Sequence, residues 1–376
     1  MNPYFIPCPD YNEENLESAL KELLAPLGGM RAFVKPGQSV LLKPNLLAAD
    51  APEKRVTTDP ALVKAVARLA LACGGQVSIG DSPALDSFSK VGQRSGMREV
   101  AGELGVPLIE LSQPVRVNVP PGGKYKSLEL ARQALNADVV INLPKLKTHS
   151  QMILTMAVKN MFGTVVAQRK AQWHHMAGND VITFASMLLD VCRTINPALT
   201  IMDGIWGMEG QGPSNGTPRH FGFLAAAADP LTLDLNLAAM LGLSWEQFPL
   251  AQAAHTLNLI PSPLPAPQWL NQRPHAAMFA NMNLPRQRSL RFLPGFLEGI
   301  TRRYLVSKPE QNTSNCILCL KCAQICPKKC ISQQGKLLKF NYRQCIRCYC
   351  CQEVCPVNAI NLKPGFLEKT LQALGK

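Results

Sequence analysis

Eight cysteines near the C-terminus of this 376-residue chain repeat one spacing twice. Each run reads C-x2-C-x2-C-x3-C-P, so three closely spaced cysteines are followed by a fourth and a proline. The runs are Cys316, Cys319, Cys322 and Cys326 before Pro327, and Cys345, Cys348, Cys351 and Cys355 before Pro356. This spacing wraps thiolates around [4Fe–4S] clusters, which carry single electrons at low potential. The pattern predicts a small unit built around two clusters.

The fourth cysteine of each run is expected to ligate the cluster of the other run, as in two-cluster ferredoxins. One cluster would take Cys316, Cys319, Cys322 and Cys355, and the other Cys345, Cys348, Cys351 and Cys326. The segment resembles bacterial-type two-cluster ferredoxins over about 50 residues. The alternatives are zinc sites and a disulfide scaffold, but zinc ribbons pair two CxxC knuckles across a longer gap, and disulfides need an oxidising compartment.

Aligning the two runs reveals an internal repeat of 29 residues. Cys330 matches Ala359 in this repeat, which predicts that Cys330 fills a small packing position. Cys350 matches Lys321. We expect Cys350 to pack beside a cluster, and its replacement of a ligand stays open as an alternative.

The rest of the sequence favours the cytoplasm. The chain has no run of about 18 uncharged apolar residues, which a membrane-spanning helix needs. The first 15 residues lack the basic and apolar regions of a signal peptide. Cluster assembly also requires reduced thiols, so we expect a cytoplasmic protein without a membrane span.

The net charge of +13 is concentrated at the C-terminal end. Residues 301–376 carry 13 Lys and Arg against 3 Asp and Glu, whereas residues 1–300 carry 26 against 23. Two clusters with their thiolates would offset about 4 of these charges. The remaining surplus suits an acidic electron-carrier protein. Nucleic acid is the alternative partner of a basic patch, but few aromatic residues lie between these basic residues, so we expect a protein.

Before the cysteine segment, apolar stretches typical of strands alternate with stretches typical of helices. Strands are expected over 39–47, 76–80, 107–111, 138–143, 199–202 and 221–228. Helices are expected over 16–27, 60–72, 97–104, 127–135, 152–166, 181–194 and 231–241. Apolar strands joined by helices favour an α/β fold with a mostly parallel sheet flanked by helices. A small α+β ferredoxin-like domain follows it at the C-terminus.

Composition divides the chain into four parts. We expect an α/β domain over 1–260, a Pro- and Arg-rich linker over 261–308, the two-cluster domain over 309–365 and a tail over 366–376. Within the linker, residues 286–303 are basic and amphipathic, which could suit a membrane surface. Pro294 and Gly295 interrupt this stretch, so we expect it to pack against the ferredoxin unit.

Unusual polar residues follow most of the predicted strands. The carboxyl ends of parallel strands line the ligand crevice of such sheets, so one cleft should gather these side chains. The predicted substrate-binding residues are Lys43, Asn45, Asp81, Lys159, Asn160, Asp203 and Glu209, and the predicted catalytic residues are Lys145, Lys147 and His149. Lysines near helix N-termini suit a carboxylate or phosphate, and a histidine can supply a proton near neutral pH.

Simpler interpretations of these residues remain open. Polar side chains at strand ends often only cap helices and satisfy loop backbone, and a histidine such as His149 is often a surface residue. His174 and His175 lie in a polar stretch and read as solvated residues or part of a lid, with a metal site as the alternative. The glycine-rich stretch 207–216 forms neither a Walker A loop nor the GxGxxG fingerprint, so ATP and NAD sites are unsupported.

Three stretches carry a family resemblance. They are NLPKLKTHSQMILTMAVKNMFG at 142–163, MDGIWGMEGQGPSNGTPR at 202–219 and GDSP at 80–83. With them the chain resembles the family known as domain of unknown function 362 over residues 38–250. Members often carry a two-cluster ferredoxin segment at the C-terminus. The resemblance implies this domain order, and it implies that Lys145, Lys147, His149, Lys159, Asn160, Asp203 and Glu209 act together.

Three functions fit these observations. The first is an iron–sulfur oxidoreductase that takes electrons from an acidic carrier and passes them to a small anionic substrate in the α/β cleft. The second is a non-catalytic electron-transfer or maturation subunit whose large domain docks a partner protein. The third is a nucleic-acid-binding protein that uses the basic C-terminal region. The sequence favours the first.

Overall fold

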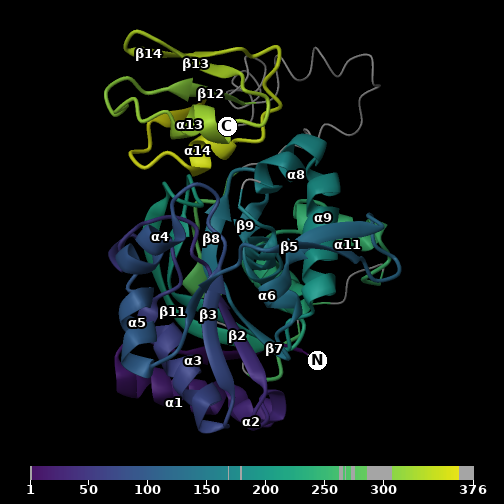
Figure 1. Ribbon diagram of the computed structural model, residues 1–376. Helices are drawn as coiled ribbons and strands as arrows, with labels where there is room; N and C mark the ends of the chain where they lie inside the picture. The colour runs from purple at the N-terminus through teal and green to yellow at the C-terminus, as the bar shows by residue number, and fades with distance from the viewer. Residues whose placement is uncertain are drawn as a thin grey trace.

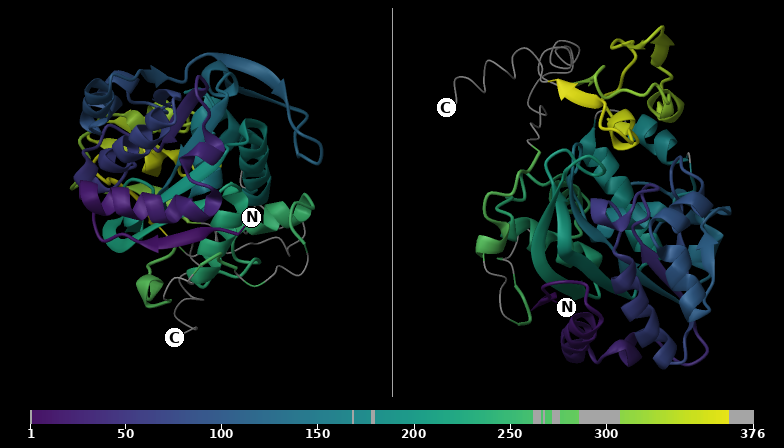
Figure 2. Two further views of the ribbon diagram at one scale, coloured as in Figure 1. Left: turned by 90° about the horizontal axis from the view of Figure 1, so that it is seen from below. Right: turned by 90° about the vertical axis from the view of Figure 1, so that its left-hand side faces the viewer.

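The structure is a computed structural model, and it describes residues 2–167, 169–177, 180–261, 266, 268–271, 276–285 and 307–363. These residues form a large α/β domain and a small cysteine-rich unit that lies beyond one end of its strands (Figure 1; Figure 2, right). The predicted contact of residues 286–303 with the ferredoxin unit lies outside the described residues, as does the C-terminal tail. Among the described helices, none has the length and apolar character needed to cross a membrane.

A nine-stranded mixed sheet runs through the large domain in the order β1-β11-β10-β7-β2-β3-β4, with β8 paired to β10 and β9 paired to β8. The strands are β1 (Tyr4–Pro7), β2 (Ser39–Pro44), β3 (Gln76–Asp81), β4 (Leu108–Glu110), β7 (Val139–Leu143), β8 (Lys145–His149), β9 (Ile153–Thr155), β10 (Leu199–Glu209) and β11 (Thr217–Ala227). Neighbours from β10 to β4 are parallel, whereas β1 and β11 pair antiparallel. The predicted α/β fold with a mostly parallel sheet is confirmed.

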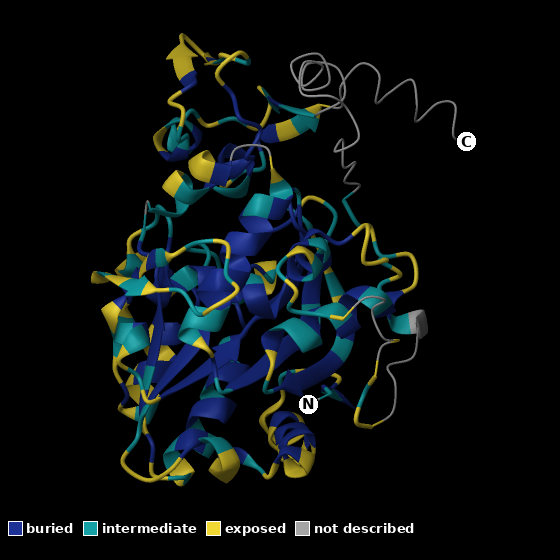
Figure 3. Ribbon diagram, turned by 90° about the vertical axis from the view of Figure 1, so that its right-hand side faces the viewer, coloured by how far each residue is buried: buried dark blue, intermediate teal, exposed yellow. Residues whose placement is uncertain are grey.

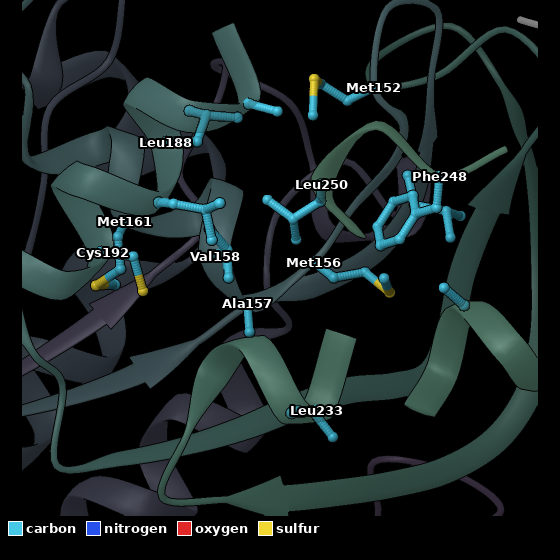
Figure 4. Close-up of a cluster of buried hydrophobic side chains, with 14 of the residues drawn as sticks. Met152, Met156, Ala157, Val158, Met161, Leu188, Cys192, Leu233, Phe248 and Leu250 are labelled. Carbon is cyan, nitrogen blue, oxygen red and sulfur yellow. The ribbon is translucent and has the colours of Figure 1, made fainter. Parts of the chain in front are cut away.

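Helices cover both faces of this sheet. One face carries α1 (Glu13–Leu24), α2 (Met30–Phe33), α3 (Pro60–Ala72) and α5 (Met97–Leu104), and the other carries α7 (Ala157–Asn160), α9 (Val181–Ile195), α10 (Pro230–Met240) and α11 (Pro249–Thr256). Successive residues of β11 alternate between the two cores, with Phe223 in one and Leu224 in the other, because strand side chains point to opposite faces in turn. Figure 3 shows the buried strands, and Figure 4 shows the core around Met156 and Leu250.

Two predicted helices are wrong. Residues 127–135 form β6 (Ser127–Ala131), which pairs with β5 (Pro114–Asn118), before the short helix α6 (Arg132–Leu135). Leu128 and Leu130 are buried while Glu129 is exposed, which is the alternation of a strand.

Residues 152–166 form β9, α7 and a 3-10 helix over Met161–Thr164 instead of one continuous helix. Ile153 has a φ of 64°, which breaks a right-handed helix, and Leu154 pairs with Thr148 of β8. The Asp234 carboxylate accepts the backbone N–H groups of Ala157 and Val158 at 2.7 and 2.9 Å. This buried acid therefore places the start of α7.

The cysteine-rich unit displays the 29-residue repeat in its backbone. Its elements are β12 (Lys308–Gln311), α13 (Lys321–Ile325), β13 (Ile331–Gln334), β14 (Leu337–Phe340), α14 (Cys350–Glu353) and β15 (Ile360–Lys363). Elements β12, α13 and β13 begin 29 residues before β14, α14 and β15, respectively. Left-handed backbone recurs at the same interval, at Leu318, Leu320 and Lys329 and again at Arg347, Tyr349 and Asn358. The two halves therefore share one local fold.

Candidate functional site

The eight motif cysteines surround two separate cavities in the small unit. One cavity is lined by Cys316, Cys319, Cys322 and Cys355, and the other by Cys345, Cys348, Cys351 and Cys326. The fourth cysteine of each run thus lies with the three cysteines of the other run. Each set fits the four-thiolate ligand set of a [4Fe–4S] cluster. Within the described residues, no three His, Cys, Asp or Glu side chains converge as the ligands of a single metal ion would.

A backbone N–H group points at the sulfur of the fourth cysteine of each run. Ala359 N–H donates to Cys355 Sγ at 3.1 Å, and Cys330 N–H lies 3.5 Å from Cys326 Sγ. These donors occupy equivalent repeat positions, and hydrogen bonds to sulfur are one way that proteins set cluster potentials. The Cys330 side chain is buried beside the second cavity, and Cys350 lines that cavity as well.

A further cavity lies between the small unit and the α/β domain. Its floor comes from the segments that follow β2 and β3, and one wall comes from α7 and α8 (Arg169–Ala177). Its roof comes from Lys321 and Ile325 of α13 and from Cys350, Glu353 and Val354 on or next to α14. Lys321 and Cys350 are repeat partners, and so are Ile325 and Val354. Equivalent faces of the two short helices therefore cover the cavity, and both helices face the α/β domain in Figure 1.

A buried ion pair forms part of the floor. Lys43 Nζ lies 2.9 Å from Asp81 Oδ1, and both side chains are almost completely buried. The other Asp81 oxygen accepts the Leu46 N–H at 2.7 Å. Gly163 lies against this pair: a Cβ there would lie 2.1 Å from Asp81 Oδ1 and 2.5 Å from Lys43 Nζ. Only glycine therefore fits beside the Lys43–Asp81 pair.

An amide network joins the strands beneath the cavity. Asn160 donates to the Lys43 carbonyl at 3.1 Å and to Asn142 Oδ1 at 2.8 Å, and it accepts from Asn45 Nδ2 at 3.0 Å. Lys147 Nζ donates to Asn45 Oδ1 at 3.0 Å and to the Val56 carbonyl at 2.6 Å. Burial lowers the pKa of Lys147 to about 7, and neighbouring lysines add to this effect. Lys147 therefore supports the floor from behind and does not line the cavity.

Lys159 of α7 projects into the cavity. Among the described residues, no hydrogen bond or ion pair of at most 4.0 Å involves its ammonium group. Burial lowers the pKa of Lys159, while Glu353 of the small unit opposes this shift. Lys170 also lines the cavity, but it donates to the carbonyls of Ser82 and Val165 at 2.6 and 2.5 Å. Lys159 is thus the cation most available to a ligand.

Two buried histidines lie near Lys159. The predicted position of His174 in a solvated loop is wrong, because α8 buries its ring to 4% exposure and stacks it on Phe184 at 4.2 Å. His174 lines the cavity, and within the described chain its Nδ1 atom has no hydrogen-bond partner. His149 is also fully buried, which excludes a surface position. Burial lowers the pKa of His149 to about 4, and Lys159 reinforces this shift.

His149 contacts the small unit directly. Its Nδ1 accepts the N–H groups of Gln151 and Met152 at 3.0 and 3.1 Å, and its Nε2 lies 2.7 Å from Glu353 Oε1. Burial alone would raise the pKa of Glu353, but His149, Lys159 and His174 together lower it below its usual range. Glu353 is therefore an anion held by α/β residues, with its imidazole partner neutral.

Lys145 and Asp203 form a second buried network. Lys145 Nζ donates to Asp203 Oδ2 at 2.9 Å and to Tyr11 Oη at 2.8 Å. Asp203 also accepts the Tyr11 hydroxyl at 2.7 Å and the Asp59 N–H at 3.0 Å. Neither Lys145 nor Asp203 lines the cavity. Their ion pair joins β8, β10 and the start of α3.

Glu209 lies apart from the other predicted site residues. Its carboxylate accepts from Arg219 at 2.9 Å and from the Asn283 N–H at 3.2 Å. The structure therefore brings Lys43, Asn45, Asp81, Lys159 and Asn160 to one cavity, with Lys147 and His149 directly behind its lining and with Lys145, Asp203 and Glu209 elsewhere.

Several cavity residues were not among the sequence candidates. The cavity is also lined by Glu353, Lys170, His174, Lys321 and Asp86. Lys321 Nζ and Asp86 Oδ1 lie 2.5 Å apart. One feature of the sequence could have identified Glu353 as a candidate. It is one of only two acidic residues in 307–363, and the equivalent position in the first half of the repeat is Gln324. No local pattern distinguishes Lys170 or His174.

Comparisons with known proteins match two separate segments of the chain. Residues 40–239 match the family described as Domain of unknown function (DUF362), and residues 338–361 match a 4Fe-4S binding domain. The chain is similar to thylakoid-associated protein sll1697 of Synechocystis sp., with 40% identity over 293 residues that cover 73% of this chain and 88% of that protein.

A solved structure shows a weaker likeness. The lactate racemase apoprotein of Thermoanaerobacterium thermosaccharolyticum has 13% identity and a TM-score of 0.40, over 61% of this chain and 55% of that chain. The family match covers more than half of the chain, and the cyanobacterial relative is aligned along most of its own length. The chain belongs to the DUF362 family and carries a C-terminal 4Fe-4S binding domain.

Proposed function

We propose that this protein is an iron–sulfur oxidoreductase that binds two [4Fe–4S] clusters and acts on a small anionic substrate in the interdomain cavity. One observation carries the proposal: α13 and α14, which contain the motif cysteines Cys322 and Cys351, also roof a cavity that Lys159 lines, and no ion-pair partner for Lys159 lies among the described residues. The clusters, held by the two crossed cysteine sets, would supply single low-potential electrons. The large domain would bind the substrate.

The lining of the cavity supports an anion as substrate. Lys159 has no ion-pair partner within the described part of the chain, and a carboxylate or phosphate beside it would restore its ordinary protonation by adding negative charge. His174 offers a neutral ring beside the same space. Leu46, Phe162 and Ile325 add apolar surface to the cavity. We therefore assign Lys159 to the anionic group and His174 to a polar group of the substrate.

The predicted catalytic and binding residues take separate roles in this proposal. Lys43, Asn45, Asp81 and Asn160 shape the floor and bind polar groups of the substrate. Lys147 and His149 are positioning residues that act through Asn45 and Glu353. Lys145 and Asp203 stabilise the contact between β8, β10 and the start of α3 through their ion pair. The proposal gives Glu209 no part in binding.

We place the protein in the cytoplasm, where thiols stay reduced for cluster assembly. The relative from Synechocystis is described as thylakoid-associated. A membrane surface that faces the cytoplasm is compatible with both statements, since attachment there needs no spanning helix.

The first experiment measures anion binding by the anaerobically purified full-length protein. Inorganic phosphate and short-chain carboxylates are the probes, and thermal stabilisation is the readout. At least one probe should stabilise the wild type. Lys159→Gln should weaken that probe at least about tenfold, equal to about 1.4 kcal/mol, while the exposed control Lys126→Gln binds normally. Iron and acid-labile sulfide should stay at about eight each per chain in all three proteins, as two cubes require.

The second experiment tests electron transfer. A short-chain carboxylate that also carries a reducible carbonyl group should reoxidise the dithionite-reduced protein, because converting the carbonyl to an alcohol takes two protons and two electrons, one from each cluster. Lys159→Gln should slow this reaction. If no probe binds while a partner protein co-purifies with the clusters, a non-catalytic electron-transfer or maturation subunit is the better description. Zinc in place of iron would contradict both.

A further inference from the structure

The two cysteine loops occupy equivalent repeat positions but have different surroundings. Ile317 and Ile346 are repeat partners; Ile317 is 62% exposed, whereas Ile346 is 9% exposed. Cys319 is likewise exposed, whereas its repeat partner Cys348 is buried. The local backbone is the same in both halves, so the difference comes from what lies next to each loop.

The apolar residues of the second loop pack against the α/β domain, whereas the first loop contacts that domain through Lys321 and Asp86. Ile346, Cys348 and Cys350 pack in one apolar cluster with Ile325, and Ala84, Leu85 and Ala171 of the large domain pack against that cluster. In the part of the chain that the structure describes, no such apolar cover lies over Ile317, which lines the first cysteine cavity. The apolar residue at this loop position is thus buried in the second half of the repeat and exposed in the first.

The solvent-facing side of the small unit is strongly basic. Residues 307–363 contain nine Lys and Arg but only two acids, Glu310 and Glu353. Glu353 points into the α/β domain, and Glu310 is paired with Lys363 at 3.0 Å. The exposed cations are Lys328, Lys329, Lys336, Lys339, Arg343 and Lys363. A surface of this charge attracts an acidic macromolecule and raises its association rate.

We propose that the first cysteine loop, residues 316–322, is the docking surface for an acidic electron-carrier protein. This rests on the proposed function only in that the cysteines hold redox clusters. Ile317 supplies an apolar contact beside Cys319, the most accessible of the motif cysteines. The exposed Lys and Arg side chains of the same small unit supply charge complementarity. The second loop offers a carrier no comparable apolar contact, because Ile346 and Cys348 are buried in a cluster against which Ala84, Leu85 and Ala171 pack.

The test measures binding of an acidic plant-type [2Fe–2S] ferredoxin as the probe, by titration calorimetry at low and high salt. The full-length, cluster-loaded protein is compared with Ile317→Glu and with Leu270→Glu, which places the same charge on an exposed apolar residue outside the small unit, beside Pro3. We expect Ile317→Glu to weaken binding at least about tenfold and Leu270→Glu to change it less than about twofold, and we expect wild-type affinity to fall with salt.

Equal effects of both substitutions, or binding that is absent or indifferent to salt, would overturn the proposal. Iron content and the visible spectrum report whether Ile317→Glu retains its clusters. If it does not, Ile317→Ser, which only removes the apolar contact, replaces it in the same comparison. The cavity variant Lys159→Gln should bind the probe like the wild type, so failure of this proposal is distinguishable from failure of the proposed function.

Discussion

His149 Nε2 on β8 and Glu353 Oε1 on α14 lie 2.7 Å apart, and this contact links the α/β domain to the cysteine-rich unit. Lys321 and Asp86 form a second polar link, and Asn215 donates to the Gln352 carbonyl at 3.0 Å. Glu353, Lys321 and Asp86 line the cavity, so two of the contacts that hold the two parts together also shape the proposed binding site.

Substitution of Glu353 tests the buried link. Glu353→Gln should lower the free energy of unfolding by about 3 kcal/mol, because removing one member of a buried charged cluster leaves the others uncompensated. Glu310→Gln is the matched control, since it breaks an exposed pair with Lys363 in the same unit and should cost less than about 1 kcal/mol. Urea unfolding of the cluster-loaded proteins is the measurement. Similar costs for the two would contradict the importance of the interdomain link.

Acid should destabilise the protein through its buried histidines. The pKa of His174 is lowered from 6.5 to about 3 by burial, with Lys159 and His149 adding to the shift and Glu353 opposing it. Because the unfolded chain binds the proton more readily, stability is complete above about pH 6.5 and falls as the pH drops toward 3. By pH 5.5 the loss should reach about 1.4 kcal/mol from this histidine.

The adjacent histidines supply the control for this pH dependence. Between pH 7.5 and 5.5, His174→Asn should reduce the slope of unfolding free energy against pH, whereas His175→Asn, at an exposed position, should retain the wild-type slope. A slope that is the same in all three proteins would show that His174 does not carry the effect.

Glycine at position 163 is a steric requirement of the Lys43–Asp81 pair. Gly163→Ala should displace this pair and lower the free energy of unfolding by about 3 kcal/mol, as expected when a buried ion pair is broken. It should also weaken anion binding. Gly102→Ala is the control: it adds a methyl group to open space within α5 and should stabilise the protein by about 0.5–1 kcal/mol. Denaturant midpoints of the two variants should therefore move in opposite directions.

Lys145 and Asp203 should behave as a structural pair. Lys145→Met should be strongly destabilising because it leaves the buried Asp203 carboxylate without its cation. Lys145→Met combined with Asp203→Asn should recover much of this loss, since no charge is then left unpaired. Unfolding of both variants is compared, with phosphate and carboxylate binding as a second measurement. Loss of binding at preserved stability would instead indicate that Lys145 contacts the substrate.

The sequence predicted most accurately where local periodicity is strong. The helices over 60–72 and 97–104 begin and end as expected, and Asp59 caps the first by accepting the Ala61 N–H at 3.0 Å. Prediction from the sequence failed where contacts between residues far apart in the chain determine the local structure. The apolar stretch after Gln151 has the composition of a helix, but pairing with β8 and the remote carboxylate of Asp234 divide it into a strand and two short helical turns.

The site was predictable in part for the same reason. Lys43, Asn45 and Asp81 follow parallel strands, and strand ends meet at one edge of a sheet. The cavity itself could not be predicted, because its roof comes from a unit that lies far along the chain and docks through individual contacts such as His149 with Glu353. Lys145 shows that a position after a strand is not enough to predict a site residue. It also follows a strand, but its ammonium group donates hydrogen bonds to Asp203 and Tyr11 instead of lining the cavity.

The roof of the cavity consists of two helices of five and four residues, α13 and α14. Helices this short do not persist in water by themselves, and both contain cysteines assigned to the clusters. A chain synthesised during iron starvation would therefore possess Lys159 and the floor beneath it but not an enclosed site. Iron supply would then determine, at the level of folding, how many copies of the protein have a closed cavity for the proposed substrate.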